Sequence, residues 1–293
     1  MTTDLSFSLK EISLWTSDAS IVKIPELQRG LVWKPAQVEL LWDSILRSFP
    51  VGSFMLSDIP EDYGFYLMDG QQRFNAISIG FGTVKNPRAI LWLDINPKNL
   101  KNSSRTFWIK ATTIAHPWGF ANNDECSTLS ASDRRLALER FGLYGKNIYN
   151  DVIDLRNTWP IKASRPIPLQ FFLDAPLEDK VTFTKYIIDK CGQEKFRFFE
   201  VNPITEEETE RISSFYDAFN KLKGYTICAN LLTRDVIENE TSVANNEEGV
   251  TTLETLFTRL NTGGTRITQE DLSYSAIKAY WPEIKDKNDS IAE

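Results

Sequence analysis

The segment YLMDGQQRFNAI (residues 66–77) passes from an apolar strand pattern through a glycine turn into a helical pattern. A strand beginning at Phe65 is expected to end at Asp69, because Asp69 and Gly70 form a typical turn pair. A helix is expected to begin at Gln71 or Gln72. The segment therefore predicts a strand, a tight turn and a helix in succession, with polar side chains gathered at the junction.

The sequence on either side of this segment predicts a mixture of helices and strands. A helix is expected from Pro35 to Phe49, since proline suits a first helical position and apolar residues recur at intervals of three and four. Strands are expected in SFMLSDI from Ser53, AILWLDI from Ala89 and TFWIKAT from Thr106. These elements predict a small sheet with flanking helices in the first part of the chain.

From about Ser130 the pattern becomes mainly helical. Helices are expected in SDRRLALERFGL, PLEDKVTFTKYIID and TEEETERISSFYDAFNKLKG, the last with Thr205 and Glu208 as a capping box. The segment TICANLL from Thr226 is expected to return to the sheet, residues 239–249 to form a mobile loop, and a last helix to begin at Thr268. We predict a mixed α+β fold with an α/β domain at residues 1–129 and a mainly helical region at residues 130–293.

Composition limits the classes of function. The three cysteines, Cys126, Cys191 and Cys228, stand far apart and in no paired spacing, so we expect neither a zinc site nor a disulfide framework. The chain shows no signal peptide and no apolar run of membrane-spanning length, which predicts a soluble cytoplasmic protein. The formal net charge of -7 argues against DNA binding over most of the surface. A local basic groove stays open, with five candidate arginines in the first third of the chain: Arg29, Arg47, Arg73, Arg88 and Arg105.

The DGQQR segment (residues 69–73) suits a phosphate. Unpaired N–H groups at a helix start and the guanidinium of Arg73 would converge on one anion. Asp69 would hold Mg²⁺, orient a water molecule or bind a sugar hydroxyl. The alternative is a plain turn with Asp69 as the N-cap and Arg73 paired to a carboxylate. The chain contains no Walker A motif, so a nucleotide site here would be of another kind.

Two further segments are polar where their surroundings are apolar. In IPELQRGLVW (residues 24–33), Gln28 and Arg29 offer planar donors to a phosphate, or pin a loop over the sheet. In FTRLNTGGTRIT (residues 257–268), the NTGG turn allows close approach to a ligand or ends a helix; its candidate residues are Asn261, Gly263 and Gly264. Trp33 and Trp118 are candidates for stacking on a base. The lone histidine, His116, is expected to be structural, and one histidine is too few for an HNH nuclease motif.

The chain resembles the N-terminal domain family of GmrSD-type restriction proteins. The segments IPELQRGLVW, YLMDGQQRFNAI and FTRLNTGGTRIT occur in the order and spacing of that family, and the turn SFPVGSF lies between the first two. The resemblance implies a fold related to ParB and sulfiredoxin. It also implies nucleotide binding or hydrolysis that depends on the DGQQR motif and regulates a separate HNH-type nuclease acting on modified or foreign DNA. The chain lacks such a nuclease region, so it is expected to be either a shortened form or a stand-alone subunit, and one that does not cleave DNA alone.

These observations lead to one main expectation, an NTP-binding and NTP-hydrolysing regulatory domain of a restriction or phage-defence protein. The expected catalytic residues are Asp69, Gln71 and Gln72, with Mg²⁺ held through Asp69. The expected phosphate-binding residues are Gln28, Arg29, Gly70, Arg73, Asn261, Gly263 and Gly264, with Trp33 for base stacking. Expected partners are a nucleoside triphosphate, an HNH-type nuclease and, through the full assembly, DNA, but no membrane. The alternatives are a DNA or modified-base sensor and a ParB-like metal-dependent nuclease. The sequence leaves open whether the domain hydrolyses its nucleotide and whether it forms a homodimer.

Overall fold

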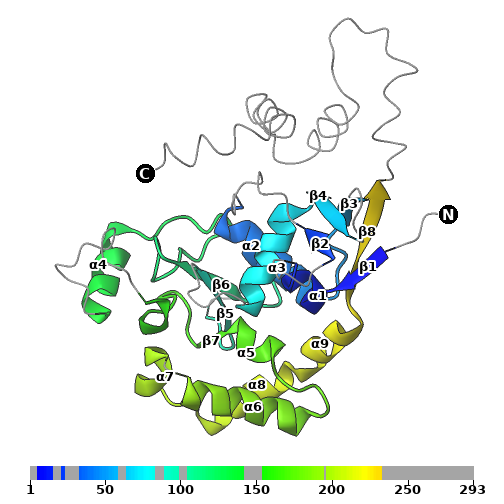
Figure 1. Cartoon of the computed structure of the whole chain (residues 1–293). Coiled ribbons are helices and arrows are strands. Elements are labelled where there is room, and N and C mark those ends of the chain that lie inside the picture. Colours follow the sequence, from blue (N-terminus) through cyan, green and yellow to red (C-terminus); the bar gives the residue numbers. More distant parts are fainter. Residues whose placement is uncertain are drawn as a thin grey trace, which may run out of the picture.

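The computed structural model describes residues 5–15, 21–23, 33–58, 64–82, 89–98, 104–141, 154–194 and 196–232. Two sheets lie at the centre of this part of the chain, and helices cover them (Figure 1). The mixed α+β class predicted from the sequence is confirmed. None of the described helices is long and apolar enough to span a bilayer.

The larger sheet has five strands in the order β1-β8-β3-β4-β2. Their bounds are β1 Leu5–Ser8, β8 Thr226–Leu232, β3 Phe54–Asp58, β4 Phe65–Asp69 and β2 Val22–Lys23. β8 pairs antiparallel with β1 and parallel with β3, while β4 pairs antiparallel with β3 and parallel with β2, so the sheet is mixed. The predicted return of the 226–232 segment to the sheet is confirmed, and β8 becomes the neighbour of the strand pair that leads into the DGQQR segment.

A second, three-stranded sheet has the order β6-β5-β7, with β5 at Ala89–Asp94, β6 at Ile109–Thr113 and β7 at Pro166–Pro168. Its strands pair antiparallel. The sequence predicted β5 and the region of β6 but placed them in a single small sheet, because a strand pattern identifies a strand and not its partner. β6 begins later than predicted because the N–H groups of Thr106 and Phe107 donate to Asp43 Oδ1 instead of a neighbouring strand. Each sheet includes strands from both sides of residue 130, and the domain boundary there stays a prediction.

Nine α-helices and two 3-10 turns lie within the described residues. The helices are α1 Leu9–Ser13, α2 Pro35–Leu46, α3 Gln71–Phe81, α4 Ala131–Arg140, α5 Leu169–Leu173, α6 Lys180–Gln193, α7 Arg197–Val201, α8 Glu206–Ser214 and α9 Tyr216–Lys221, with 3-10 turns at Leu155–Asn157 and Leu222–Gly224. The predicted capping box is confirmed, since Glu208 N–H donates to Thr205 Oγ1 and Thr205 N–H donates to Glu208 Oε2. α5 lies between the second sheet and α6 (Figure 1).

Helices α2 and α3 are locked together by a tryptophan. Trp42 on α2 is fully buried, and its Nε1–H donates to the carbonyl of Ala76 on α3 at 2.9 Å. Gly80, one turn further along α3, allows this approach, because a Cβ atom there would lie 2.1 Å from the Trp42 ring. The contact fixes the position of α3, and therefore of the DGQQR segment at its start.

The Gly80→Ala variant is expected to lower the free energy of unfolding by about 1–3 kcal/mol, because the added methyl group overpacks the Trp42 contact. Gly192 in α6 provides the matched control, since nothing lies within 4 Å of a Cβ built there. The Gly192→Ala variant should raise stability by about 0.5–1 kcal/mol through the higher helix propensity of alanine. Urea unfolding measures both changes, and equal effects would contradict the described α2–α3 packing.

A buried ionic network joins α2 to β6 and to the segments that precede and follow β6. Glu39 on α2 is 1% exposed and accepts from Arg105 Nη1 at 2.6 Å, while Lys110 Nζ lies 3.6 Å from the same carboxylate. The Cys126 thiol donates to Glu39 Oε2 at 3.1 Å, and Ala111 N–H donates to Oε1 at 3.3 Å. One carboxylate therefore serves two cations, a thiol and a backbone amide.

The three cysteines should differ in their reactivity toward a thiol reagent. Burial is the first cause that raises the pKa of Cys126 to about 11 and that of Cys191 to about 12, so both stay protonated at pH 8. Cys228 is exposed. Titration of the folded protein with a chromogenic disulfide reagent is expected to modify Cys228 rapidly, and all three thiols only in denaturant. Rapid modification of a second thiol in the folded protein would contradict the burial of Cys126 and Cys191.

Candidate functional site

The start of α3 lacks a side-chain cap. β4 ends at Asp69, Gly70 occupies the N-cap position with φ +99°, and α3 begins at Gln71. Glycine suits this left-handed conformation and has no side chain to accept from the first-turn N–H groups. The N-terminus of α3, without a side-chain cap, therefore places the positive end of the helix dipole at the end of β4.

The guanidinium of Arg73 fills the space between two glycine turns. Its Nη1 donates to the carbonyl of Ser53 at 2.8 Å, and its Cζ lies 5.5 Å from the centroid of the Phe54 ring. A Cβ atom at Gly52 would lie 2.8 Å from Nη2, and one at Gly70 would lie 3.2 Å from Nη1. Both glycines have positive φ, so their shape and their lack of a side chain make room for the guanidinium.

The charge of Arg73 is poorly compensated in this position. Desolvation is the largest influence on the Arg73 pKa and lowers it, while the charges of Asp69 and Tyr225 act in the opposite direction. Nε is buried without a hydrogen-bond partner, and no carboxylate of the described residues forms an ion pair with this side chain. A bound anion would supply the missing countercharge.

Strand β8 adds two polar side chains to this neighbourhood that sequence reasoning missed. Asn230 Nδ2 donates to Ser53 Oγ at 3.0 Å, and the hydroxyl of Tyr225, just before β8, donates to the carbonyl of Phe49 at 2.7 Å. Burial raises the pKa of Tyr225. These contacts hold the chain from residue 49 to residue 53 beside Arg73. The only sequence signal was the predicted strand at residues 226–232, which does not identify its neighbours.

Trp33 links the entry of α2 to the DGQQR segment. Its backbone N–H donates to Gln72 Oε1 at 3.2 Å, and its half-buried side chain packs against the hydrophobic core. The structure thus brings Trp33 together with residues 69–73 of the predicted site. The other predicted phosphate-binding residues lie outside the described residues: Gln28, Arg29, Asn261, Gly263 and Gly264.

Several expectations for the site need correction. Gly70 and not Asp69 is the N-cap of α3, and Arg73 bonds to a main-chain carbonyl, so the plain-turn alternative does not describe this junction. Trp118 is 2% exposed and has no accessible face for stacking on a base. The expectation of a structural His116 needs no correction: burial lowers its pKa, and its ring lies 4.7 Å from that of Phe120.

Two of the five arginines proposed for a local basic groove form contacts within the fold. Arg105 pairs with buried Glu39, and Arg47 Nη1 contacts both Asp43 Oδ2 at 3.4 Å and the Ser104 carbonyl at 2.9 Å. Their guanidinium groups are therefore used in the fold. Arg29 and Arg88 lie outside the described residues.

Asp69 fits a metal ion carried by a nucleotide better than a metal site made by protein alone. It is an exposed carboxylate at the end of β4, next to the α3 N-terminus. Among the residues that the structure describes, no three histidine, cysteine, aspartate or glutamate side chains form a cluster for a metal ion. Mg²⁺ in nucleotide sites commonly takes one or two carboxylates, with phosphate oxygens and water completing its coordination. A single carboxylate beside a phosphate site meets this requirement.

Comparison with known proteins identifies a family for the chain. A family model described as "GmrSD restriction endonuclease, N-terminal domain" matches residues 11–278. The match spans most of the chain, including the DGQQR segment and all the described strands except β1. No curated protein matches the sequence.

Proposed function

Since the chain belongs to the family of GmrSD restriction endonuclease N-terminal domains, we propose that it is a nucleotide-binding regulatory domain that controls a separate nuclease. The phosphates of a nucleoside triphosphate bind at the N-terminus of α3. The observation that carries this proposal is Arg73, a largely desolvated cation without a carboxylate partner among the described residues, at a helix start that has no side-chain cap.

The positive charge of Arg73 would be stabilised by a bound phosphate. Burying a cation without a countercharge is unfavourable, and the fold holds Arg73 in place with one hydrogen bond to Ser53 and the face of Phe54. A phosphate accepts charge-assisted hydrogen bonds from a guanidinium and from helix N-terminal N–H groups at the same time. A bound phosphate would therefore stabilise the Arg73 guanidinium by providing its countercharge.

The polar residues around the phosphate position then take distinct roles. Asp69 would hold a Mg²⁺ ion that accompanies the triphosphate, and such an ion would supply positive charge next to the phosphoryl oxygens. Gln71, at the first position of α3, orients the attacking water molecule. Gln72 is held by its hydrogen bond to Trp33 and couples the motif to the segment that enters α2.

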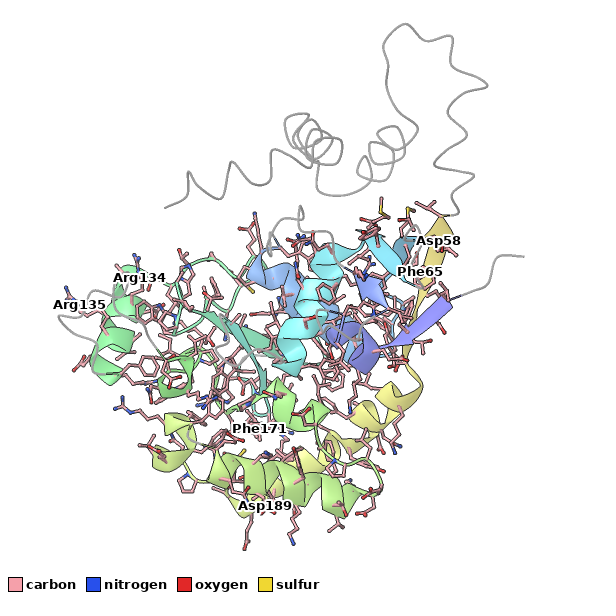
Figure 2. The ribbon with its side chains drawn as sticks, viewed as in Figure 1. Asp58, Phe65, Arg134, Arg135, Phe171 and Asp189 are labelled. Atoms are coloured by element: carbon pink, nitrogen blue, oxygen red, sulfur yellow. The ribbon has the colours of Figure 1, made fainter. Side chains whose placement is uncertain are left out.

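The proposal predicts Mg²⁺-dependent hydrolysis of at least one of the four common nucleoside triphosphates by the purified chain. The Asp69→Ala variant should lower the turnover rate about 100-fold or more, because the carboxylate that positions the ion is lost. Phosphate release measures the rate. Asp58→Ala is the matched control, since Asp58 ends the neighbouring strand β3 and is labelled near Phe65 in Figure 2. Equal loss in both variants would contradict a specific role for Asp69.

The same preparation separates the alternative functions. Salt-sensitive DNA binding that is lost in an Arg29→Ala variant, without any nucleotide binding, would instead support a DNA-sensing domain. DNA nicking that requires a metal ion and is lost in Asp69→Ala would support a nuclease. The internal contacts of Arg47 and Arg105, with the net charge of -7, give the DNA-sensing alternative less support.

A further inference from the structure

A cavity of about 360 Å³ lies at the opposite end of α3 from the DGQQR segment. We name it the α5–α6 cavity. Its walls come from the end of α3, the start of β5, helices α5 and α6, and residues 156, 168 and 196. α3 has 11 residues, so its two ends are about 15 Å apart at 1.5 Å per residue. The cavity is therefore separate from the candidate phosphate site.

One part of the wall of the α5–α6 cavity is apolar. Leu91, Phe171 and Phe196 line it and are buried, with the Phe171 and Phe196 rings 5.6 Å apart in an edge-to-face arrangement. Figure 2 labels Phe171 on α5, between the second sheet and α6. A volume of this size, with aromatic side chains and a few polar groups in its wall, is found in sites for small organic ligands.

Charged side chains of both signs also line the cavity. Lys190 and Glu194 form one ion pair on α6, with 3.3 Å between Nζ and Oε1. Arg156 and Asp174 are both exposed, and neither forms an ion pair with any of the described residues. The cavity thus offers one cation and one carboxylate that are not paired with each other, beside the apolar part of its wall.

We propose that the α5–α6 cavity binds a small zwitterion with an apolar body, of the size of a free amino acid. The ammonium group of the ligand pairs with Asp174, its carboxylate pairs with Arg156, and its body packs against Phe171 and Phe196. A ligand with one charge would leave one of these two groups without a partner.

The surroundings of Asp174 support this assignment. Asp174 is exposed as a residue, but neighbouring atoms partly desolvate its carboxylate, and this is the largest influence on its pKa, which is raised. A hydrogen bond from Gln170 and the charges of Lys190 and Lys10 act in the opposite direction. The C-terminal end of α3, capped at Gly82, also lines the cavity and carries the negative end of the helix dipole. Both features favour an ammonium group on this side.

Calorimetric titration of the whole chain with free amino acids tests the proposal. The probes are L-phenylalanine, L-tyrosine, L-leucine and L-methionine, and we expect at least one to bind at millimolar concentration or below. Phenethylamine and 3-phenylpropionate, which each lack one of the two charges, should bind about tenfold more weakly than L-phenylalanine if that probe binds, since one charge-assisted interaction is lost. For another probe, the corresponding amine and carboxylic acid serve the same purpose.

Variants of Asp174 and Arg156 test whether the ligand binds in the α5–α6 cavity. Asp174→Asn and Arg156→Gln should each weaken binding about tenfold. The matched controls Asp189→Asn and Arg135→Gln change exposed charges that Figure 2 shows on the outer side of α6 and on α4, and should leave the affinity unchanged. Thermal unfolding confirms that each variant is folded. Absence of binding by all four amino acids, or equal effects of site and control variants, would overturn the proposal, whatever the outcome for nucleotides.

Discussion

The Glu39→Ala variant is expected to lose about 3–5 kcal/mol in the free energy of unfolding, the largest stability effect that we predict. Removing the carboxylate leaves Arg105 and Lys110 buried without their countercharge, and the thiol of Cys126 and the N–H of Ala111 without their acceptor. The lost attraction is only part of the effect, because two desolvated cations stay behind. Urea unfolding followed by circular dichroism measures the change.

A surface ion pair provides the comparison for this prediction. Asp133 and Lys162 form a pair with 2.7 Å between Oδ1 and Nζ, and both side chains are partly exposed. Breaking it with Asp133→Ala should cost about 1 kcal/mol or less, since solvent screens the charges and replaces the partner, although the variant also removes the hydrogen bond to the Ser130 N-cap. Equal losses in the two variants would mean that the Glu39 network is not buried as described.

The Arg73→Ala variant is expected to weaken nucleotide binding by a factor of about 10–100, because a hydrogen-bonded charge contributes about 1.5–3 kcal/mol. Arg73→Lys keeps the charge but loses the planar fork, so it should restore only part of the affinity. Equilibrium titration with the nucleotide that binds most tightly measures all three proteins.

Folding must be controlled in this comparison, because Arg73 also bonds to the carbonyl of Ser53. The melting temperature of each variant tests whether the loss of affinity follows the loss of stability. Arg135→Ala removes an exposed arginine on α4 and should change neither quantity. Wild-type affinity in a folded Arg73→Ala variant would exclude this guanidinium from the site.

Local pattern was sufficient to predict the elements that form the candidate site. β3, β4, α2 and α3 were predicted close to their observed bounds, because proline, glycine and apolar periodicity mark them within a few residues. β1 and β2 were missed, since strands of four and two residues carry too little pattern and depend on pairing with β8 and β4. The second sheet was missed for a related reason, because partner choice depends on contacts distant in sequence.

The residues of the candidate site could be predicted from the sequence, but their contacts with one another could not. The turn at Asp69-Gly70 and the helix start at Gln71 follow from the sequence. The position of the Arg73 guanidinium between Gly52 and Gly70 does not, because it depends on how the end of β4 meets the start of β3. Glu39 was not among the residues singled out from the sequence, because it is buried where β6 packs against α2.

We propose that the N-terminus of α3 binds nucleotide phosphates. An equilibrium titration of the purified wild-type chain with ligands that differ only in phosphate number tests this proposal. The series is a nucleoside, its monophosphate, its diphosphate and its triphosphate, with Mg²⁺, repeated for the four common bases. We expect the affinity to rise with phosphate number and the nucleoside alone not to bind. Binding that is equal across the series, or absent for every triphosphate with a well-folded protein, would contradict it.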